Sequence, residues 1–216
     1  RAEDGQAPHG TPLVVETNLA ARAREVADVT GAGYTVIATL AISLAAGVGL
    51  GANPIFTFDN EEQRQRWLPD LCAGTALGGF GLTEPEAGSD LASLRVRADK
   101  NGDGSHYLLN GQKCWQSYAQ DMDYLWVLAR TGSQDSRGRG LSLFICDKHA
   151  AGVTVSPLPT LDGDQLNEVY FDRVQVTLAQ RVGEENRAWP IIGEALADER
   201  HIQFPPGRVR RDLEDM

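Results

Sequence analysis

The sequence of 216 residues lacks the features of several broad classes of protein. Lys and Arg total 20 against 30 Asp and Glu, a formal charge of −10, and this acidic balance argues against a nucleic-acid partner, which needs clustered basic residues. The longest apolar run, residues 36–50, is interrupted by Thr, Ser and Gly and is too short to span a membrane. Gly and Pro are too sparse for a collagen-like or disordered chain.

Cysteine and histidine are also scarce. The three cysteines, Cys72, Cys114 and Cys146, form no CxxC pair, which predicts free thiols in a reducing compartment. The four histidines show no metal-ligand spacing, so no metal site is expected. The first residues lack the basic and apolar stretches of a secretory signal. We therefore expect a cytoplasmic protein, or a mitochondrial-matrix protein if the source is eukaryotic.

Three compositional zones predict an α+β fold. Residues 1–75 are Ala-rich with helical periodicity and predict part of an N-terminal helical domain. Residues 76–182 contain short alternating segments between turn clusters and predict a central antiparallel β-domain, a sandwich or barrel. Residues 183–216 return to a helical pattern and predict the start of a C-terminal helical domain. The chain thus reads as a piece of a longer protein.

Two sets of boundaries follow from local patterns. Residues 59–63 supply a polar N-cap and early acidic residues for a helix, with Trp67 on its apolar side and Pro69 limiting its length. Seven strands are predicted in the central zone, at residues 94–98, 107–109, 124–129, 141–146, 153–156, 168–171 and 174–176.

Residues 78–90 form the sharpest motif. Thr83 places a hydroxyl at a strand end, Gly88 permits close approach of the backbone to a ligand, and Ser89 is a donor suited to phosphate or carbonyl oxygens. Taken alone, such a segment also fits an ordinary hairpin turn. The full string resembles the Thr-Glu-Pro-x-Ala-Gly-Ser-Asp signature of the acyl-CoA dehydrogenase family.

Further motifs extend this resemblance over about residues 53–200 in the expected order. Residues 61–69 are similar to the helix before the signature, and residues 109–117 to the second flavin segment, in which a Trp precedes a Thr or Ser by two residues. The remaining similar segments are residues 140–144, 152–153, 168–172 and 198–200.

The resemblance implies FAD as cofactor and places its ring beside the first motif. Phe80, Gly81, Leu82 and Thr83 would border the flavin, with backbone amides and the Thr83 hydroxyl facing its polar edge. Ser89 would lie near the FAD pyrophosphate and the pantetheine arm of a CoA thioester.

The second motif would complete the cofactor site. The resemblance places Trp115 against one face of the isoalloxazine and the Ser117 hydroxyl near N5, although an isolated Trp in a β-domain is more often a core residue. Ser117 stands where many members have Thr, and Gln116 replaces a commonly apolar residue, which would add a polar group beside the ring.

The catalytic base is expected from a helix that follows the β-domain. Glu199 stands before Arg200, where some family members carry the Glu that removes the α-proton. Arg200 would then belong to the substrate mouth. The alternatives are that Glu199 is a surface carboxylate and that the base lies in the absent C-terminal domain, which in this family also completes FAD binding across a dimer.

The resemblance implies an FAD-dependent acyl-CoA dehydrogenase that desaturates an acyl-CoA thioester between the α and β carbons. Its expected partners are the acyl-CoA substrate, an electron-transfer flavoprotein or similar acceptor, and further subunits of a homo- or hetero-oligomer. Two alternatives remain: a non-catalytic subunit of a two-chain dehydrogenase, and an oxygen-using relative such as an acyl-CoA oxidase or flavin monooxygenase.

Overall fold

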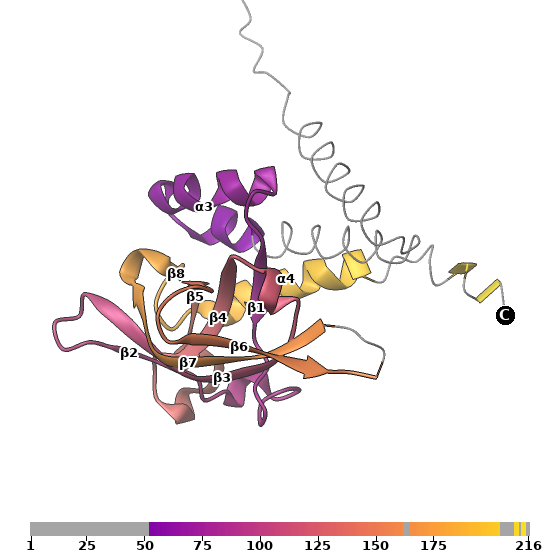
Figure 1. Cartoon of the computed structure of the whole chain (residues 1–216). Helices are drawn as coiled ribbons and strands as arrows, with labels where there is room; N and C mark the ends of the chain where they lie inside the picture. The colour runs from indigo at the N-terminus through magenta and orange to yellow at the C-terminus, as the bar shows by residue number, and fades with distance from the viewer. Residues whose placement is uncertain (1–51, 162–164, 204–209, 212, 215–216) are drawn as a thin grey trace, which may run out of the picture.

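A computed structural model describes residues 52–161, 165–203, 210–211 and 213–214 (Figure 1). Most of the helical zone expected over residues 1–75 therefore lies outside the described residues. Residues 52–58 are helical and lead into α3 (Glu61–Ala73).

Helix α3 begins with a reciprocal cap. Asn60 accepts a hydrogen bond from the Gln63 amide at 2.9 Å, and the Gln63 side chain accepts one from the Asn60 amide at 3.3 Å. The helix ends at Gly74, whose φ of 65° suits the left-handed cap that glycine adopts easily. The predicted start of this helix is confirmed.

The predicted effect of Pro69 is wrong, because this proline lies inside α3 and the helix continues to Ala73. Burial explains the difference. Trp67 and Leu71 flank Pro69 and are 5% and 1% exposed, so the helix is fixed by packing on both sides of the interruption. Packing of an apolar face outweighs the intrinsic penalty of one proline here.

Within the described residues, eight strands form one mostly antiparallel sheet, ordered β6-β7-β3-β2-β4-β5-β8 with β1 beside β4. Their bounds are β1 (Gly78–Gly81), β2 (Arg97–Lys100), β3 (His106–Ser117), β4 (Tyr124–Arg130), β5 (Leu141–Asp147), β6 (Val153–Pro159), β7 (Gln165–Thr177) and β8 (Arg181–Val182). Two pairs differ from the expected antiparallel pattern, since β1 and β2 each run parallel to β4. Both reach β4 through longer connections than a hairpin, and side-chain alternation along a strand does not encode that direction.

Several predicted strand boundaries also differ. The strand expected at residues 107–109 is much longer, since β3 runs from His106 to Ser117 and includes Asn110 and Gly111. The segments at 168–171 and 174–176 are one strand, β7, which bulges at Arg173 with φ 51°. The strand expected from residue 94 begins only at Arg97. Leu94 and Val96 are buried, but the Leu94 carbonyl and the Val96 amide bind the side chains of Arg130 and Glu84, whereas the Val96 carbonyl bonds to the backbone of β4, at Arg130.

Short 3₁₀ helices lie in several of the segments that connect the strands. The described part of the chain contains the 3₁₀ helices η1 (Leu91–Ser93), η2 (Ala119–Asp121), η3 (Gln134–Gly140) and η4 (Leu178–Gln180). The longer α-helix α4 (Ala188–Gln203) follows the sheet. In the part of the chain that the structure describes, no helix is long and apolar enough to cross a membrane.

The core divides along the central strand β4. Leu125 and Val127 belong to a cluster formed mainly by strands of the sheet, whereas Trp126 and Leu128 belong to a cluster with residues of α3 and α4. Alternation along β4 thus sends successive side chains to opposite faces, and the two helices cover one of them (Figure 1).

Asp59 joins the start of α3 to the end of the sheet. It is 5% exposed, and its Oδ1 accepts a hydrogen bond from the Gly183 amide at 2.8 Å. Its Oδ2 is buried and has no hydrogen-bond partner among the described residues. Burial raises the pKa of Asp59 from 3.8 to about 6, because desolvation outweighs the Gly183 amide and two nearby arginines.

We expect Asp59→Asn to stabilise the protein at pH 8 by on the order of 1–3 kcal/mol, because the amide keeps the acceptor for Gly183 and removes a buried charge. The folded pKa lies above the unfolded value, so the stability contributed by the protonated carboxyl is fully present below about pH 4 and is lost as the pH rises through about 6. Thermal unfolding of both proteins across this range measures the effect. The advantage of the variant should disappear below about pH 4, and equal stability at pH 8 would contradict the prediction.

Candidate functional site

The two predicted motif segments meet along β3. The Cys114 amide donates to the Thr83 carbonyl at 3.0 Å. Strand β2 pairs with β3 only up to Asn110. Beyond that point the same edge of β3 has no paired β2 residue, and the loop through Thr83 lies along it. Thr83 therefore lies beside the residue that precedes Trp115 and roughly 10 Å along the strand from Ser117.

A buried ion pair fixes this junction. Lys113 is fully buried, and its Nζ lies 2.8 Å from Oε1 of Glu84 and 2.8 Å from the Leu82 carbonyl oxygen. The Glu84 carboxylate also accepts hydrogen bonds from the amides of Arg95, at 2.6 Å, and Val96, at 3.0 Å. Desolvation lowers the pKa of Lys113 to about 8, although the Glu84 carboxylate opposes the shift.

Glu84 and Lys113 were missed by the sequence analysis. A single Glu or Lys in a motif is usually exposed to solvent, so nothing in the sequence assigned either residue a role in the site. The available signal was that the second motif contains a single charge, Lys113, whereas the first contains three of the opposite sign, Glu84, Glu86 and Asp90. The sequence does not show that both charges become buried in contact with each other.

The carbonyls around Thr83 are occupied, whereas its donors are free. The carbonyls of Leu82 and Thr83 accept hydrogen bonds from Lys113 and Cys114. Among the described residues, neither the Thr83 amide nor its hydroxyl has a hydrogen-bond partner, and the residue is half-buried. A backbone held in this way presents the Thr83 amide to a polar ligand as a preorganised donor, and the hydroxyl of the same residue is a second free donor.

Trp115 lies in a β-bulge and faces solvent. The register between β3 and β7 shifts between Lys113 and Gln116, and Trp115 has φ 61°, which is unusual for a bulky residue. Its side chain is 60% exposed, and Ser117 is exposed two residues further on. The bulge thus turns a large planar side chain to the surface, and strained backbone of this kind is concentrated at ligand sites.

Gln116 points the other way. It is 4% exposed, and no described residue hydrogen-bonds its side-chain oxygen or nitrogen. A Cβ added at Gly81 would lie 3.4 Å from Oε1 of Gln116, so the amide lies under the end of β1. The structure therefore places this side chain inside the fold and not beside the exposed indole of Trp115.

The other predicted site residues lie on three elements. Phe80 is half-buried on β1, its ring centroid 6.1 Å from that of Trp126. Ser89 is exposed in the turn after the bridge between Glu84 and Ala87. Residues 199 and 200 are helical within α4, but their side chains lie outside what the structure describes.

A basic cleft of about 480 Å³ opens where η3 meets the start of α4. Arg137, Arg139, Arg187 and the 44%-exposed Trp189 are among its lining residues. Arg137 forms an ion pair at 2.5 Å with Asp90, the neighbour of Ser89, so the cleft adjoins the end of the first motif. Arg187 approaches Glu184 at 3.9 Å.

Buried Arg130 holds two walls of this cleft together. Its guanidinium donates to the carbonyls of Ala92, at 2.8 Å, and Leu94, at 3.0 Å, after the first motif. It also donates to the carbonyls of Ser133 and Arg137 near η3, both at 3.1 Å. The walls are thus fixed independently of any ligand.

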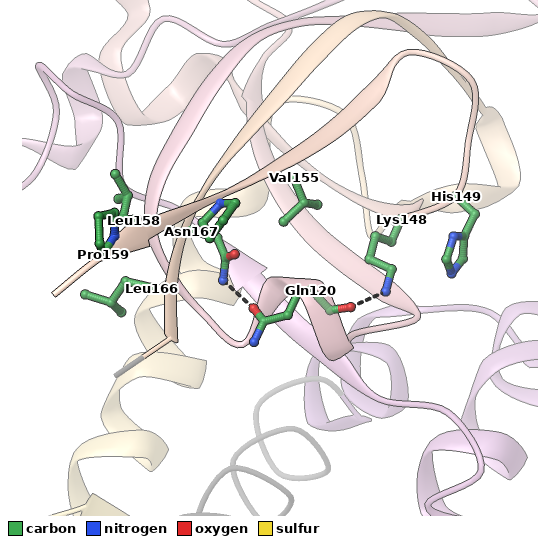
Figure 2. A pocket seen from close by; sticks show the side chains of 9 residues that line it. Gln120, Lys148, His149, Val155, Leu158, Pro159, Leu166 and Asn167 are labelled. Carbon is green, nitrogen blue, oxygen red and sulfur yellow. Dashed lines mark hydrogen bonds between the residues drawn. The ribbon is translucent and has the colours of Figure 1, made fainter. Parts of the chain in front are cut away.

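A second cleft, of about 690 Å³, lies beside β6 and the start of β7 (Figure 2). Gln120 accepts hydrogen bonds from Lys148 and from Asn167, both at 2.6 Å, and the rest of the lining is mainly apolar. No group of three His, Cys, Asp or Glu residues in the described part of the chain is placed to hold a metal ion.

Comparison with known proteins gives a consistent family. The acyl-CoA dehydrogenase middle-domain model matches residues 79–174, and the N-terminal-domain model of the same family matches residues 23–75. The chain is 40% identical over 150 residues to acyl-CoA dehydrogenase FadE29 of Mycobacterium tuberculosis. The aligned region covers 69% of this chain and 38% of that relative. The chain thus spans about two fifths of the length of the curated relatives it matches.

Solved structures agree with this match. The butyryl-CoA dehydrogenase of Megasphaera elsdenii has a TM-score of 0.69 and 35% identity, over 76% of this chain and 43% of that one. An acyl-CoA dehydrogenase from Bacillus anthracis, solved in complex with FAD, has a TM-score of 0.68 and 32% identity, over 76% of this chain and 28% of that one. The mostly antiparallel sheet with flanking helices is therefore the fold expected from the sequence.

We expect Glu84→Gln to destabilise the protein by about 3–5 kcal/mol, because it leaves the Lys113 charge buried without its partner. Glu86→Gln is the matched control: Glu86 pairs with Arg95 at 2.6 Å, but its side chain is 70% exposed, so the loss should be under about 1 kcal/mol. Chemical denaturation of both variants measures the difference. Similar losses for the two variants would show that the buried pair does not stabilise the fold.

Proposed function

The chain belongs to the acyl-CoA dehydrogenase family, and we propose that it forms the FAD- and substrate-binding β-domain of an enzyme that desaturates an acyl-CoA thioester. The proposal depends above all on the hydrogen bond between Cys114 and Thr83, which brings the free donors of Thr83 next to the exposed Trp115. Because the chain spans about two fifths of its relatives, activity, substrate and partners of the whole protein are part of this proposal. The division into an N-terminal helical domain (residues 1–75), a central β-domain (76–182) and the start of a C-terminal helical domain (183–216) is also part of this proposal.

The residues at this junction fit a flavin. Thr83 would donate from its amide and hydroxyl to the polar edge of the ring, next to Phe80, Gly81 and Leu82 on the same segment. Trp115 would cover one face of the ring, and Ser117 would reach the N5 region. The buried Gln116 side chain would lie behind this surface, and its effect on the ring would be indirect.

FAD, when bound, supplies the acceptor for the hydride that leaves the substrate β-carbon. Thr83 would then stabilise the negative charge that develops at the polar edge of the ring, because its donors are held in place before the reaction. The indole of Trp115 would exclude water from one face. Electrons would pass on to an electron-transfer flavoprotein or a similar acceptor.

The basic cleft suits the phosphates of coenzyme A. Arg139 and Arg187 offer guanidinium donors for phosphate oxygens, and Trp189 offers a flat face to an adenine ring. Ser89, next to the Asp90–Arg137 pair, is in a position to meet the pantetheine arm as it leaves the cleft. Arg200, on α4, would stand at the mouth of the substrate site.

We expect Arg139→Ala with Arg187→Ala to raise the KM for an acyl-CoA roughly tenfold, because charge-assisted contacts to phosphate are lost. The KM for the same acyl group on pantetheine, which lacks the nucleotide, should not change. Steady-state kinetics with both thioesters makes the comparison. An equal rise for both substrates would contradict recognition of the nucleotide by these arginines.

Glu199 on α4 is the proposed base that removes the α-proton. We expect the protein with FAD to lose its flavin absorbance when an acyl-CoA is added without air, and Glu199→Gln to slow this reduction by about 10²–10⁴ while FAD still binds. Glu194→Gln is the matched control, since Glu194 is exposed on the same helix. Stopped-flow absorbance measures the rates.

Each other outcome points to a named alternative. Reduction of Glu199→Gln at the parental rate would move the base to another part of the protein. Peroxide released after reduction in air would indicate an acyl-CoA oxidase. A protein that binds no FAD would indicate a non-catalytic subunit of a two-chain enzyme and would overturn the proposal.

A further inference from the structure

Lys113 contacts the peptide group that carries the free Thr83 donor. We propose that Lys113 is a positioning residue, whose buried charge strengthens the Thr83 amide as a hydrogen-bond donor and thereby tightens FAD binding and raises the flavin potential. The effect on FAD rests on the function proposed above, whereas the effect on the amide rests on the geometry of this chain.

The contact acts through a single peptide unit. Lys113 Nζ donates to the Leu82 carbonyl at 2.8 Å, and the N–H of that same peptide unit belongs to Thr83. A charged donor on the carbonyl polarises the amide, and linked hydrogen bonds of this kind strengthen one another by roughly 10–30% each. No other described residue uses the Thr83 N–H, so the whole effect is available to a ligand.

The surroundings keep the charge in place. Lys113 is 0% exposed, so water does not screen its interaction with the Leu82 carbonyl. Its partner Glu84 is itself held by the amides of Arg95 and Val96, which prevents the carboxylate from moving away with the ammonium. The pKa of Lys113, lowered to about 8 by desolvation, still leaves most of the side chain charged at pH 7.

A purely structural role would have different consequences. If Lys113 only balanced the Glu84 charge, removing both charges together would restore stability and leave the Thr83 donor unchanged. If Lys113 polarises the peptide, removing both charges would restore stability and still weaken the donor. The two possibilities therefore separate in a protein that remains folded.

The decisive comparison is between the parent and the double variant Glu84→Gln with Lys113→Met, which removes both buried charges together. Lys100→Met is the matched control, because Lys100 forms an exposed ion pair with Glu185 at 2.6 Å away from the junction. In the protein without FAD, we expect the Thr83 amide proton of the double variant to shift upfield and to exchange with solvent about tenfold more slowly, because a less polarised N–H is less acidic. Lys100→Met should keep the parental values, whereas Glu84→Gln should shift the Thr83 amide in the same direction as the double variant, because loss of the carboxylate lowers the pKa of Lys113 further.

With FAD, we expect the double variant to bind about twofold to fivefold more weakly, because the Thr83 donor is weakened and not lost, and to have a lower flavin midpoint potential than the parent. A double variant with the parental Thr83 amide shift and potential would overturn the inference. A parent that binds no FAD would contradict the proposed function instead, and the amide shift would still decide the role of Lys113.

A titration of the parent decides the question if the double variant does not fold. The Thr83 amide shift should follow the loss of the Lys113 proton, with Glu84 and the Cys114 thiol as the other titratable groups that act on this lysine. A Thr83 amide that does not respond when Lys113 is deprotonated would overturn the inference without any substitution.

Discussion

The buried ion pair between Glu84 and Lys113 is the constraint on which the candidate site depends. It joins three parts of the chain, because Lys113 lies on β3, Glu84 belongs to the first motif, and the carboxylate binds the amides that lead into β2. A buried pair offsets its desolvation only when further hydrogen bonds satisfy both charges. Here the Leu82 carbonyl and the two amides supply those bonds.

The pairing of the strands in the sheet leaves room on β3 for the loop that this ion pair holds. Strand β2 leaves the edge of β3 open beyond Asn110, and the loop through Thr83 fills that edge with a backbone hydrogen bond to Cys114. On the other edge, β7 pairs with β3 on both sides of the bulge and so holds the unusual backbone of Trp115. The strain at one residue is supported by the ladder around it.

Several local features could be predicted from the sequence because neighbouring residues determine them. The cap of α3 and most strands of the β-domain follow from side-chain type and spacing. Pro69 shows the limit of such reasoning, since burial of Trp67 and Leu71 overrides the local preference. The bulge at Arg173 shows another limit, because a break in alternation indicates the end of a strand or a bulge equally well.

By itself, the sequence determined the family, the residues of both motifs and the order of helical and β zones, because these are properties of residue order along the chain. Only the tertiary structure decided that Lys113 is buried against Glu84, that Gln116 points into the fold while Trp115 points out, and that β1 and β2 run parallel to β4. The physical reason is that burial, pairing direction and the partner of a charge depend on segments far apart in the sequence, which are brought together only when the chain folds.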